Sequence, residues 1–195
     1  LLYTILNIRG KISKKEYNLY CKKDGKLGVH PDFGTFGIAA STGSLGHGLG
    51  LAAGMSLANK NFKKKIFVLM SDGELQEGSV WEIMLLISSK KLNNIIVIID
   101  NNDLQSSTKA TDTHPTLYPI VDKFKSFGWE AKLCNGHDSK QIEQKINLKS
   151  PKPFALIAKT IKGYPISFMK NNPKWHYRSP NEQEYLQALK EIKKK

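Results

Sequence analysis

The chain has few cysteines, no long apolar run and a shortage of acidic side chains. Its 195 residues include only Cys21 and Cys134. Two cysteines cannot form a disulfide framework or a zinc site with several cysteine ligands, and this usage predicts a reducing cytoplasm. No run approaches the ~20 apolar residues of a membrane-spanning helix, so no membrane partner is expected. Residues 1–6 lack a basic leader and a cleavage site, so no signal peptide is predicted.

The excess of basic over acidic residues is the most unusual feature of the composition. Lys and Arg number 30 against 17 Asp and Glu, a formal net charge of +13. A basic chain can bind nucleic acid or attract anionic substrates. Here the lysines are scattered and flank the expected helices and strands, and no known nucleic-acid motif accompanies them. We therefore predict a solvated, lysine-rich surface that can steer phosphates, and no nucleic-acid partner.

The stretch 64–105 organises the chain. It predicts two buried strands, at 65–70 and 94–99, with a helix over 77–91 between them. Both strands are continuous apolar runs, which is typical of a parallel sheet covered on both faces. Asp72 and Asn102 follow the two carboxyl ends, where open α/β sheets bind ligands. Our hypothesis is that these two oxygen-bearing side chains share one hard cation.

The remainder of the chain repeats the alternation of strands and helices. Further strands are expected at 129–133 and 154–160. Helices are expected at 117–127, at 138–148 with Asp138 as its cap, and at the end of the chain with Asn181 as its cap. This order predicts one α/β domain over residues 1–195, with a mostly parallel sheet and helices on both faces.

Two local patterns make sharper predictions. Ser13 begins a short helix, and Glu16 is expected to complete a capping box with it. In the helix over 77–91, four residues at helical spacing are expected to face the core: Trp81, Met84, Leu85 and Ser88.

Three segments offer candidate site residues, each with an alternative interpretation. His30 precedes a proline and is held extended, either as a site residue or as a surface histidine. The glycine-rich run 39–50 leads into a small-residue helix. It suits close approach to an anion or close helix packing. His176, in the loop over 162–178, follows the carboxyl end of a strand, but aromatic packing explains it equally well.

The block 71–73, followed by 100–102, resembles the thiamine diphosphate signature, in which a Gly-Asp-Gly block precedes an Asn-bearing block. Other segments match the transketolase family in the same order: 28–31, 41–46, 72–78 with 81–82, and 159–176. The similarity covers nearly the whole chain. This chain resembles the diphosphate-binding half of transketolase. The resemblance is to the short form of the enzyme, in which two polypeptides together correspond to a single chain in other members.

The resemblance implies a ligand set. Asp72, Asn102 and the backbone carbonyl of Leu104 would hold Mg²⁺ or Ca²⁺, a choice that suits oxygen-only ligands. Thiamine diphosphate would be contacted by Asn102, by His176 and by four further residues: Gly43, Ser44, Leu45 and Gly73.

The resemblance also implies catalytic roles. His30 would face the reacting oxygen of the substrate, and His176 would lie near the thiazolium ring and the diphosphate. Glu77 would join a carboxylate network at an interface between subunits, although a glutamate at a helix start is also favoured by the helix dipole alone.

The activity implied is transfer of a two-carbon ketol unit from a ketose phosphate to an aldose phosphate by a cytoplasmic enzyme. The cofactor would supply the electron sink. The glutamate that activates it would belong to a partner subunit with the pyrimidine-binding domain, and self-association is expected as well.

The sequence departs from the family pattern at three places. Ser71 replaces the first glycine of the Gly-Asp-Gly block. The family's earlier segment with two histidines would lie before Leu1, so we expect the chain to be a fragment. Tyr177 and Arg178 follow His176 where the family usually has Gly, and Arg178 could bind a phosphate or carboxylate on another sugar.

These departures keep two alternatives open. One is a deoxyxylulose-phosphate-synthase-like enzyme, or another ketol synthase of surface-sugar metabolism. The other is a catalytically inactive scaffold subunit.

Overall fold

The computed structural model describes residues 1–35, 37–59 and 64–194. The chain divides into two compact units, Leu1–His47 and Gly48–Lys195. None of the described helices is long and apolar enough to cross a membrane.

The first unit contains two short helices, α1 (Leu2–Ile8) and α2 (Lys14–Asn18). The Ser13 hydroxyl caps α2 by accepting the N–H of Glu16 at 3.1 Å, as predicted. The predicted capping box is wrong, because the Glu16 carboxylate accepts the backbone N–H of Lys26 at 2.7 Å instead. That carboxylate ties the helix to the following loop.

The second unit is built on a four-stranded parallel sheet in the order β1-β2-β6-β5. This arrangement confirms the predicted α/β fold. The strands are β1 (Ile66–Ser71), β2 (Ile95–Asn101), β5 (Glu130–Asn135) and β6 (Phe154–Lys159). A small antiparallel hairpin, β3 (Leu104–Gln105) with β4 (Thr108–Lys109), follows β2 directly.

Helices connect the strands of this unit. The α-helices are α3 (Gly48–Ala58), α4 (Gly78–Ser89), α5 (Ala110–Thr113), α6 (Ile120–Ser126), α7 (Ser139–Ile146) and α8 (Glu182–Lys193). The 3₁₀ turns are η1 (Gly73–Gln76), η2 (Pro115–Leu117), η3 (Ser167–Met169) and η4 (Pro173–His176).

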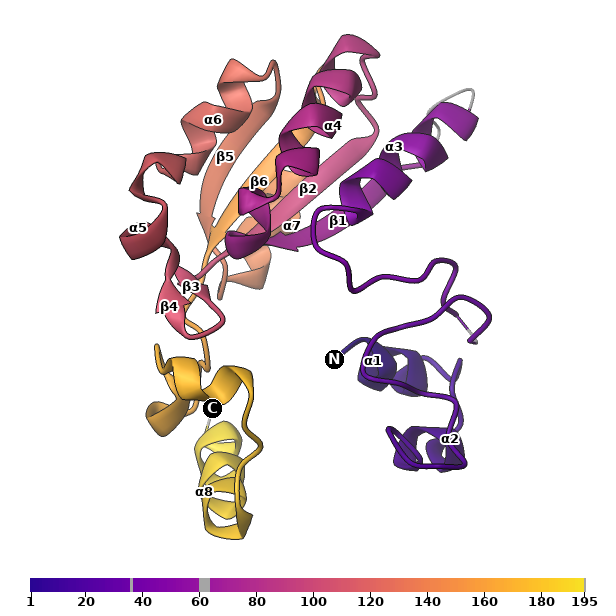
Figure 1. Ribbon diagram of the computed structural model, residues 1–195, viewed down its shortest axis with the longest axis vertical. Helices are drawn as coiled ribbons and strands as arrows, with labels where there is room; N and C mark the ends of the chain where they lie inside the picture. Colours follow the sequence, from indigo (N-terminus) through magenta and orange to yellow (C-terminus); the bar gives the residue numbers. More distant parts are fainter. Residues whose placement is uncertain (36, 60–63, 195) are drawn as a thin grey trace. The chain divides into compact units, whose positions relative to one another are not determined.

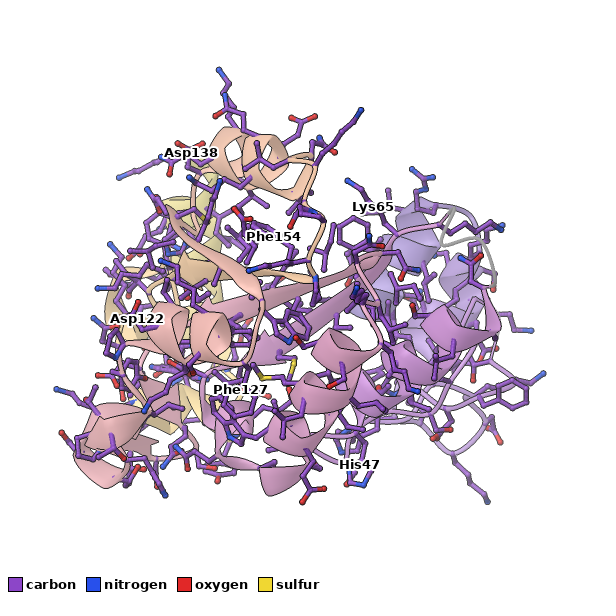
Figure 2. The ribbon with its side chains drawn as sticks, turned by 90° about the horizontal axis from the view of Figure 1, so that it is seen from above. His47, Lys65, Asp122, Phe127, Asp138 and Phe154 are labelled. Atoms are coloured by element: carbon purple, nitrogen blue, oxygen red, sulfur yellow. The ribbon has the colours of Figure 1, made fainter. Side chains whose placement is uncertain are left out.

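The sheet separates two apolar clusters. The larger packs α3, α4 and α6 against one face, and the smaller packs α7 against the other (Figure 1). Phe154 lies between the sheet and α7, whereas Phe127 lies on the opposite face beside α4 (Figure 2). Alternate residues of β2 and β6 therefore contribute to different clusters, which explains their continuous apolar sequences.

Two burial predictions are wrong in part. On β1, Phe67 is 52% exposed and Leu69 is 69% exposed. Among the described residues, α7 packs on β5 and β6 and leaves this face of β1 uncovered. On α4, Leu85 is 55% exposed, because the buried face is set by Val80, Met84 and Ile87.

Candidate functional site

Asp72 is a fully buried carboxyl group at the point where β1 ends and η1 begins. The register pairs Ser71 with Asp100, so the next residues along, Asp72 and Asn101, lie side by side. Four donors reach the Asp72 carboxylate. Its Oδ1 accepts the Gly73 N–H at 2.9 Å, and its Oδ2 accepts Asn101 Nδ2 at 2.9 Å, Asp103 N at 2.6 Å and the Tyr118 hydroxyl at 3.3 Å.

A second carboxyl group, that of Asp103, lies beside the first. It accepts the N–H and the hydroxyl of Thr111, both at 2.9 Å, and the Tyr118 hydroxyl at 3.4 Å. Burial, followed by the charges of Asp72 and Asp103, raises the pKa of Tyr118 well above its usual value. The hydroxyl therefore keeps its proton and acts as a donor to both acids.

Among the described residues, no basic side chain forms an ion pair with either of these carboxyl groups. In the part of the chain that the structure describes, the ion pairs are Lys132–Glu130 and Arg178–Glu184. Burying a carboxylate is costly unless hydrogen bonds, a basic partner or a metal compensate its charge. Two neighbouring acids without a basic partner therefore suit a hard cation, which prefers oxygen ligands.

A cation here would also need neutral oxygen ligands. Across residues 1–35, 37–59 and 64–194, no group of three or more His, Cys, Asp or Glu side chains could hold a metal. The residues after β2 offer such oxygens. Asp103, which bonds Asp72 through its N–H, lies between Asn102 and Leu104, and Asn102 Oδ1 accepts the Leu104 N–H at 2.9 Å. The predicted ligands thus belong to one segment that turns around Asp72, while their coordination of a metal stays a prediction.

The turn around Gly73 is tight. A Cβ on Gly73 would lie 3.0 Å from the Cβ of Gln105, at the hairpin that follows β2. Ser71, which replaces a family glycine, accepts the Glu74 N–H on its hydroxyl at 3.0 Å. Its side chain thus stabilises the start of η1, which gives this departure a local structural role.

Glu77 is exposed and precedes the first residue of α4. Its side chain makes no capping hydrogen bond, and its backbone N–H bonds the carbonyl of Glu74 at 3.1 Å. Its position suits the helix dipole. The interface role of its carboxylate stays a prediction.

A cavity of about 630 Å³ opens at the carboxyl ends of β2 and β6. Most of its wall comes from the segment after β2, from Tyr118 and from the end of β6. Its lining residues are Asn101, Asn102, Asp103, Leu104, Lys109, Thr111, Tyr118, Lys159, Thr160, Ile161 and Asn171. Three of the four hydrogen-bond partners of Asp72 thus form part of a cavity wall that also carries two lysines.

His176 is exposed at the end of η4 and is not among those lining residues. Its Nδ1 lies 3.4 Å from Lys162 Nζ, and its ring meets the Tyr177 ring edge-on at 4.7 Å between centroids. Arg178 pairs with Glu184 and lies over the Trp175 ring at 4.6 Å. Binding of a sugar phosphate by Arg178 would have to compete with Glu184.

The remaining predicted residues belong to the first unit. His30 is exposed, and its carbonyl accepts the Tyr3 hydroxyl at 3.0 Å. Gly43 has a φ of +135°, and a Cβ there would lie 2.9 Å from the His30 ring, so this position requires glycine. Ser44 and Leu45 are exposed. The structure thus brings Gly43 and His30 together within this unit.

Comparison with known proteins identifies the family. The family model described as "Transketolase, thiamine diphosphate binding domain" matches residues 1–193. The chain belongs to the transketolase family. As a transketolase-like, thiamine diphosphate-binding subunit, it is a member of a family of transferases.

The curated relatives include transketolases divided into subunits and longer, single-chain ones. The chain is 39% identical to an apulose-4-phosphate transketolase subunit of Actinobacillus succinogenes, over 98% of this chain and 71% of that protein. It is 36% identical to the protein of the same name from Phocaeicola vulgatus, over 98% and 69%. Human transketolase is 35% identical over 90% of this chain but only 29% of the human protein.

Solved structures agree on the fold. Transketolase from Campylobacter jejuni superposes with a TM-score of 0.90 and 28% identity, over 97% of this chain and 32% of that one. Transketolase from Leishmania mexicana gives a TM-score of 0.77 at 19% identity, a likeness of fold alone. The chain therefore spans about a third of these solved transketolases.

Four residues of this transketolase family member escaped the sequence-based prediction. Asn101, Asp103 and Tyr118 surround Asp72, and Lys162 lies beside His176. Asn101 could have been found from the strand register, which places it next to Asp72. Tyr118 lies 46 positions from Asp72 and carries no local signal in the sequence.

Proposed function

We propose that the chain binds thiamine diphosphate with Mg²⁺ and transfers a two-carbon ketol unit from a ketose phosphate to an aldose phosphate. The observation that carries this proposal is the buried Asp72 at the carboxyl end of β1, which lies next to Asp103 and has no basic partner in the described part of the chain. Family membership supplies the cofactor and the reaction class.

The cation would be held by Asp72, by Asn102 and by the carbonyl of Leu104. Mg²⁺ usually completes its coordination with water and phosphate oxygens, so this cation would neutralise the diphosphate. Gly73 would allow the backbone to approach that group closely. Lys162, 3.4 Å from His176, adds a positive charge for a phosphate oxygen.

Further residues would contact the cofactor itself. Gly43, Ser44 and Leu45 would line it, with Leu45 beside the aminopyrimidine. When bound, thiamine diphosphate supplies the electron sink for breaking a bond next to a carbonyl. His30 and His176 would hold or move protons at substrate oxygens, and Glu77 would join a carboxylate network between subunits.

A second polypeptide would complete the site. Two relatives of this chain are each named as one subunit of apulose-4-phosphate transketolase, which supports a partner here. We propose that this partner carries the pyrimidine-binding domain and the glutamate that activates the cofactor, and that the assembled enzyme self-associates. We propose the cytoplasm as its compartment, in keeping with two cysteines that are both free.

Calorimetric titration tests the cation site. Thiamine diphosphate and Mg²⁺ are titrated into the assembled enzyme, with wild-type chain or with Asp72→Asn. Loss of a ligand should weaken binding by more than the roughly 10–100-fold typical of an outer hydrogen-bond partner. The control is Glu82→Gln, which removes the charge of an exposed carboxylate on α4. This variant should bind like wild type. Equal binding by Asp72→Asn would contradict the proposal.

Substrate assays test the reaction. The assembled enzyme is given ketose phosphates with an aldose acceptor, and separately pyruvate. The names of the relatives make apulose 4-phosphate the first sugar phosphate to assay. We expect ketol transfer without release of CO₂. Release of CO₂ from pyruvate would instead indicate a deoxyxylulose-phosphate-synthase-like enzyme, and cofactor binding without any turnover would indicate a scaffold.

A further inference from the structure

A single tyrosine hydroxyl lies between the buried Asp72 and the partly buried Asp103. We propose that Tyr118, held by Asp103, is a positioning residue that fixes the Asp72 carboxylate so that only its Oδ1 faces the cation. This inference rests on the proposed cation site and adds to it the residue that orients the carboxylate ligand.

The hydrogen bonds at Asp72 are distributed unequally. A carboxylate has about four lone-pair directions, two on each oxygen. Three donors converge on Oδ2, from Asn101, Asp103 and Tyr118. Oδ1 accepts one donor, the Gly73 N–H. One direction on Oδ1 thus remains for a cation, and Oδ2 has none to give, so coordination through both oxygens is excluded while these bonds persist.

Tyr118 is itself held in place from both sides. Its neighbours Leu117 and Ile120 are buried in the larger apolar cluster. Its hydroxyl lies 3.3 Å from Asp72 Oδ2 and 3.4 Å from Asp103 Oδ1, and one proton serves both acceptors. Asp103 is fixed in turn by two bonds of 2.9 Å from Thr111. The network therefore joins the segment after β2 to the start of α6.

The consequence is a preference between cations. Mg²⁺ requires near-ideal octahedral geometry at about 2.0–2.1 Å, whereas Ca²⁺ accepts longer and more irregular sets that include bidentate carboxylates. A carboxylate held so that only one of its oxygens faces the cation suits Mg²⁺. Without the Tyr118 hydroxyl, Asn101 and the Asp103 N–H would still bond Oδ2, but the link from Asp72 through Tyr118 to Asp103 would be lost. The Asp72 carboxylate would then be less firmly oriented, which harms Mg²⁺ binding more than Ca²⁺ binding.

The test is Tyr118→Phe, which removes only the hydroxyl. The assembled enzyme is titrated with Mg²⁺ and with Ca²⁺ in the presence of thiamine diphosphate, by calorimetry. Affinity for Mg²⁺ should fall roughly 10–100-fold, and affinity for Ca²⁺ by clearly less. Tyr185→Phe, on α8 with the tyrosine 52% exposed, is the matched control and should leave both affinities unchanged.

Three outcomes separate the hypotheses. If the wild type binds neither cation, or if Asp72→Asn binds like wild type, the proposed function fails. A second outcome is that wild type binds and Asp72→Asn does not, but Tyr118→Phe keeps its affinities for Mg²⁺ and Ca²⁺ within about twofold of wild type. That result would overturn the positioning role. A proportional loss of both affinities would also overturn it. If Tyr118→Phe does not fold, Asp103→Asn replaces it: a lower Mg²⁺ to Ca²⁺ affinity ratio supports the role, and an unchanged ratio contradicts it.

Discussion

The carboxyl end of β1 and the loop that follows β6 hold their predicted site residues in contrasting environments. Asp72 is fully buried and receives four hydrogen bonds. His176, in the loop over 160–178, is exposed and lies beside Lys162. The first region is organised by the chain itself before any ligand arrives, whereas the second presents its histidine to solvent. Ligand-binding loops generally belong to the less stable parts of a fold.

The loop is nevertheless anchored at several points away from His176. The His137 ring accepts the Ile161 N–H at 2.8 Å and packs at a tilt against the Tyr164 ring, with 4.1 Å between centroids. Trp175 Nε1 donates to the Phe168 carbonyl at 3.0 Å. These contacts fix the loop around His176, while His176 itself lies on its exposed part.

The largest expected effect is on His176→Ala. An exposed side chain can be removed with a stability change within about 0.5 kcal/mol, while loss of a proton-transfer group lowers kcat by roughly 10²-fold. Steady-state kinetics and thermal unfolding of the assembled enzyme measure the two quantities. Lys174→Ala, an exposed change in the same turn, should leave kcat as in wild type. An unaltered kcat in His176→Ala would remove this histidine from the site.

An intermediate effect is expected for Gly163→Ala. Gly163 has a φ of +82°, and a Cβ there would lie 2.3 Å from the Met169 carbonyl oxygen. Strain and overlap should lower the free energy of unfolding by about 1–3 kcal/mol, as measured with denaturant. The control is Gly54→Ala in α3, where the new Cβ would meet nothing within 4 Å and helix propensity favours alanine. If both variants lost stability equally, the anchored frame of the loop would be in doubt.

The smallest expected effect is a pH dependence of the hydrogen bonds between Ser167 in η3 and Glu191 in α8. Hydrogen bonds from the Ser167 hydroxyl and N–H lower the pKa of Glu191 from 4.5 to about 2. A lowered pKa in the folded state means that the contact stabilises above pH 4.5 and is lost as the pH falls toward 2. The chemical shift of the Ser167 amide should therefore titrate near pH 2, and Glu191→Gln should abolish that titration. A midpoint near 4.5 would show that the contact does not form in solution.

Much of the fold could be predicted because its signals are local. The strand at 154–160 was evident from its apolar run, and the caps at Asp138 and Asn181 were predicted and confirmed. Leu85 was placed wrongly, because an apolar stretch does not reveal which helical face a neighbour will cover. The predicted burial of Phe67 was wrong for the same reason, since the burial of a strand depends on the helices that pack over it.

The site residues likewise fall into those with a local sequence signal and those that depend on tertiary structure. Asp72 and Asn102 stood out because each follows a strand, a feature that sequence shows directly. The roles of Asn101 and Tyr118 depend on strand register and on where α6 begins, neither of which is a property of local sequence. Motifs thus locate candidate ligands, while the residues that orient them emerge from the tertiary structure.

The most direct measurement of the central claim is anomalous diffraction from crystals of the assembled enzyme grown with Mn²⁺ and thiamine diphosphate. We expect one Mn²⁺ within about 2.5 Å of Asp72 Oδ1, Asn102 Oδ1 and the Leu104 carbonyl, with Asp72 Oδ2 uncoordinated. An anomalous peak elsewhere, or bound cofactor with no metal beside Asp72, would contradict it.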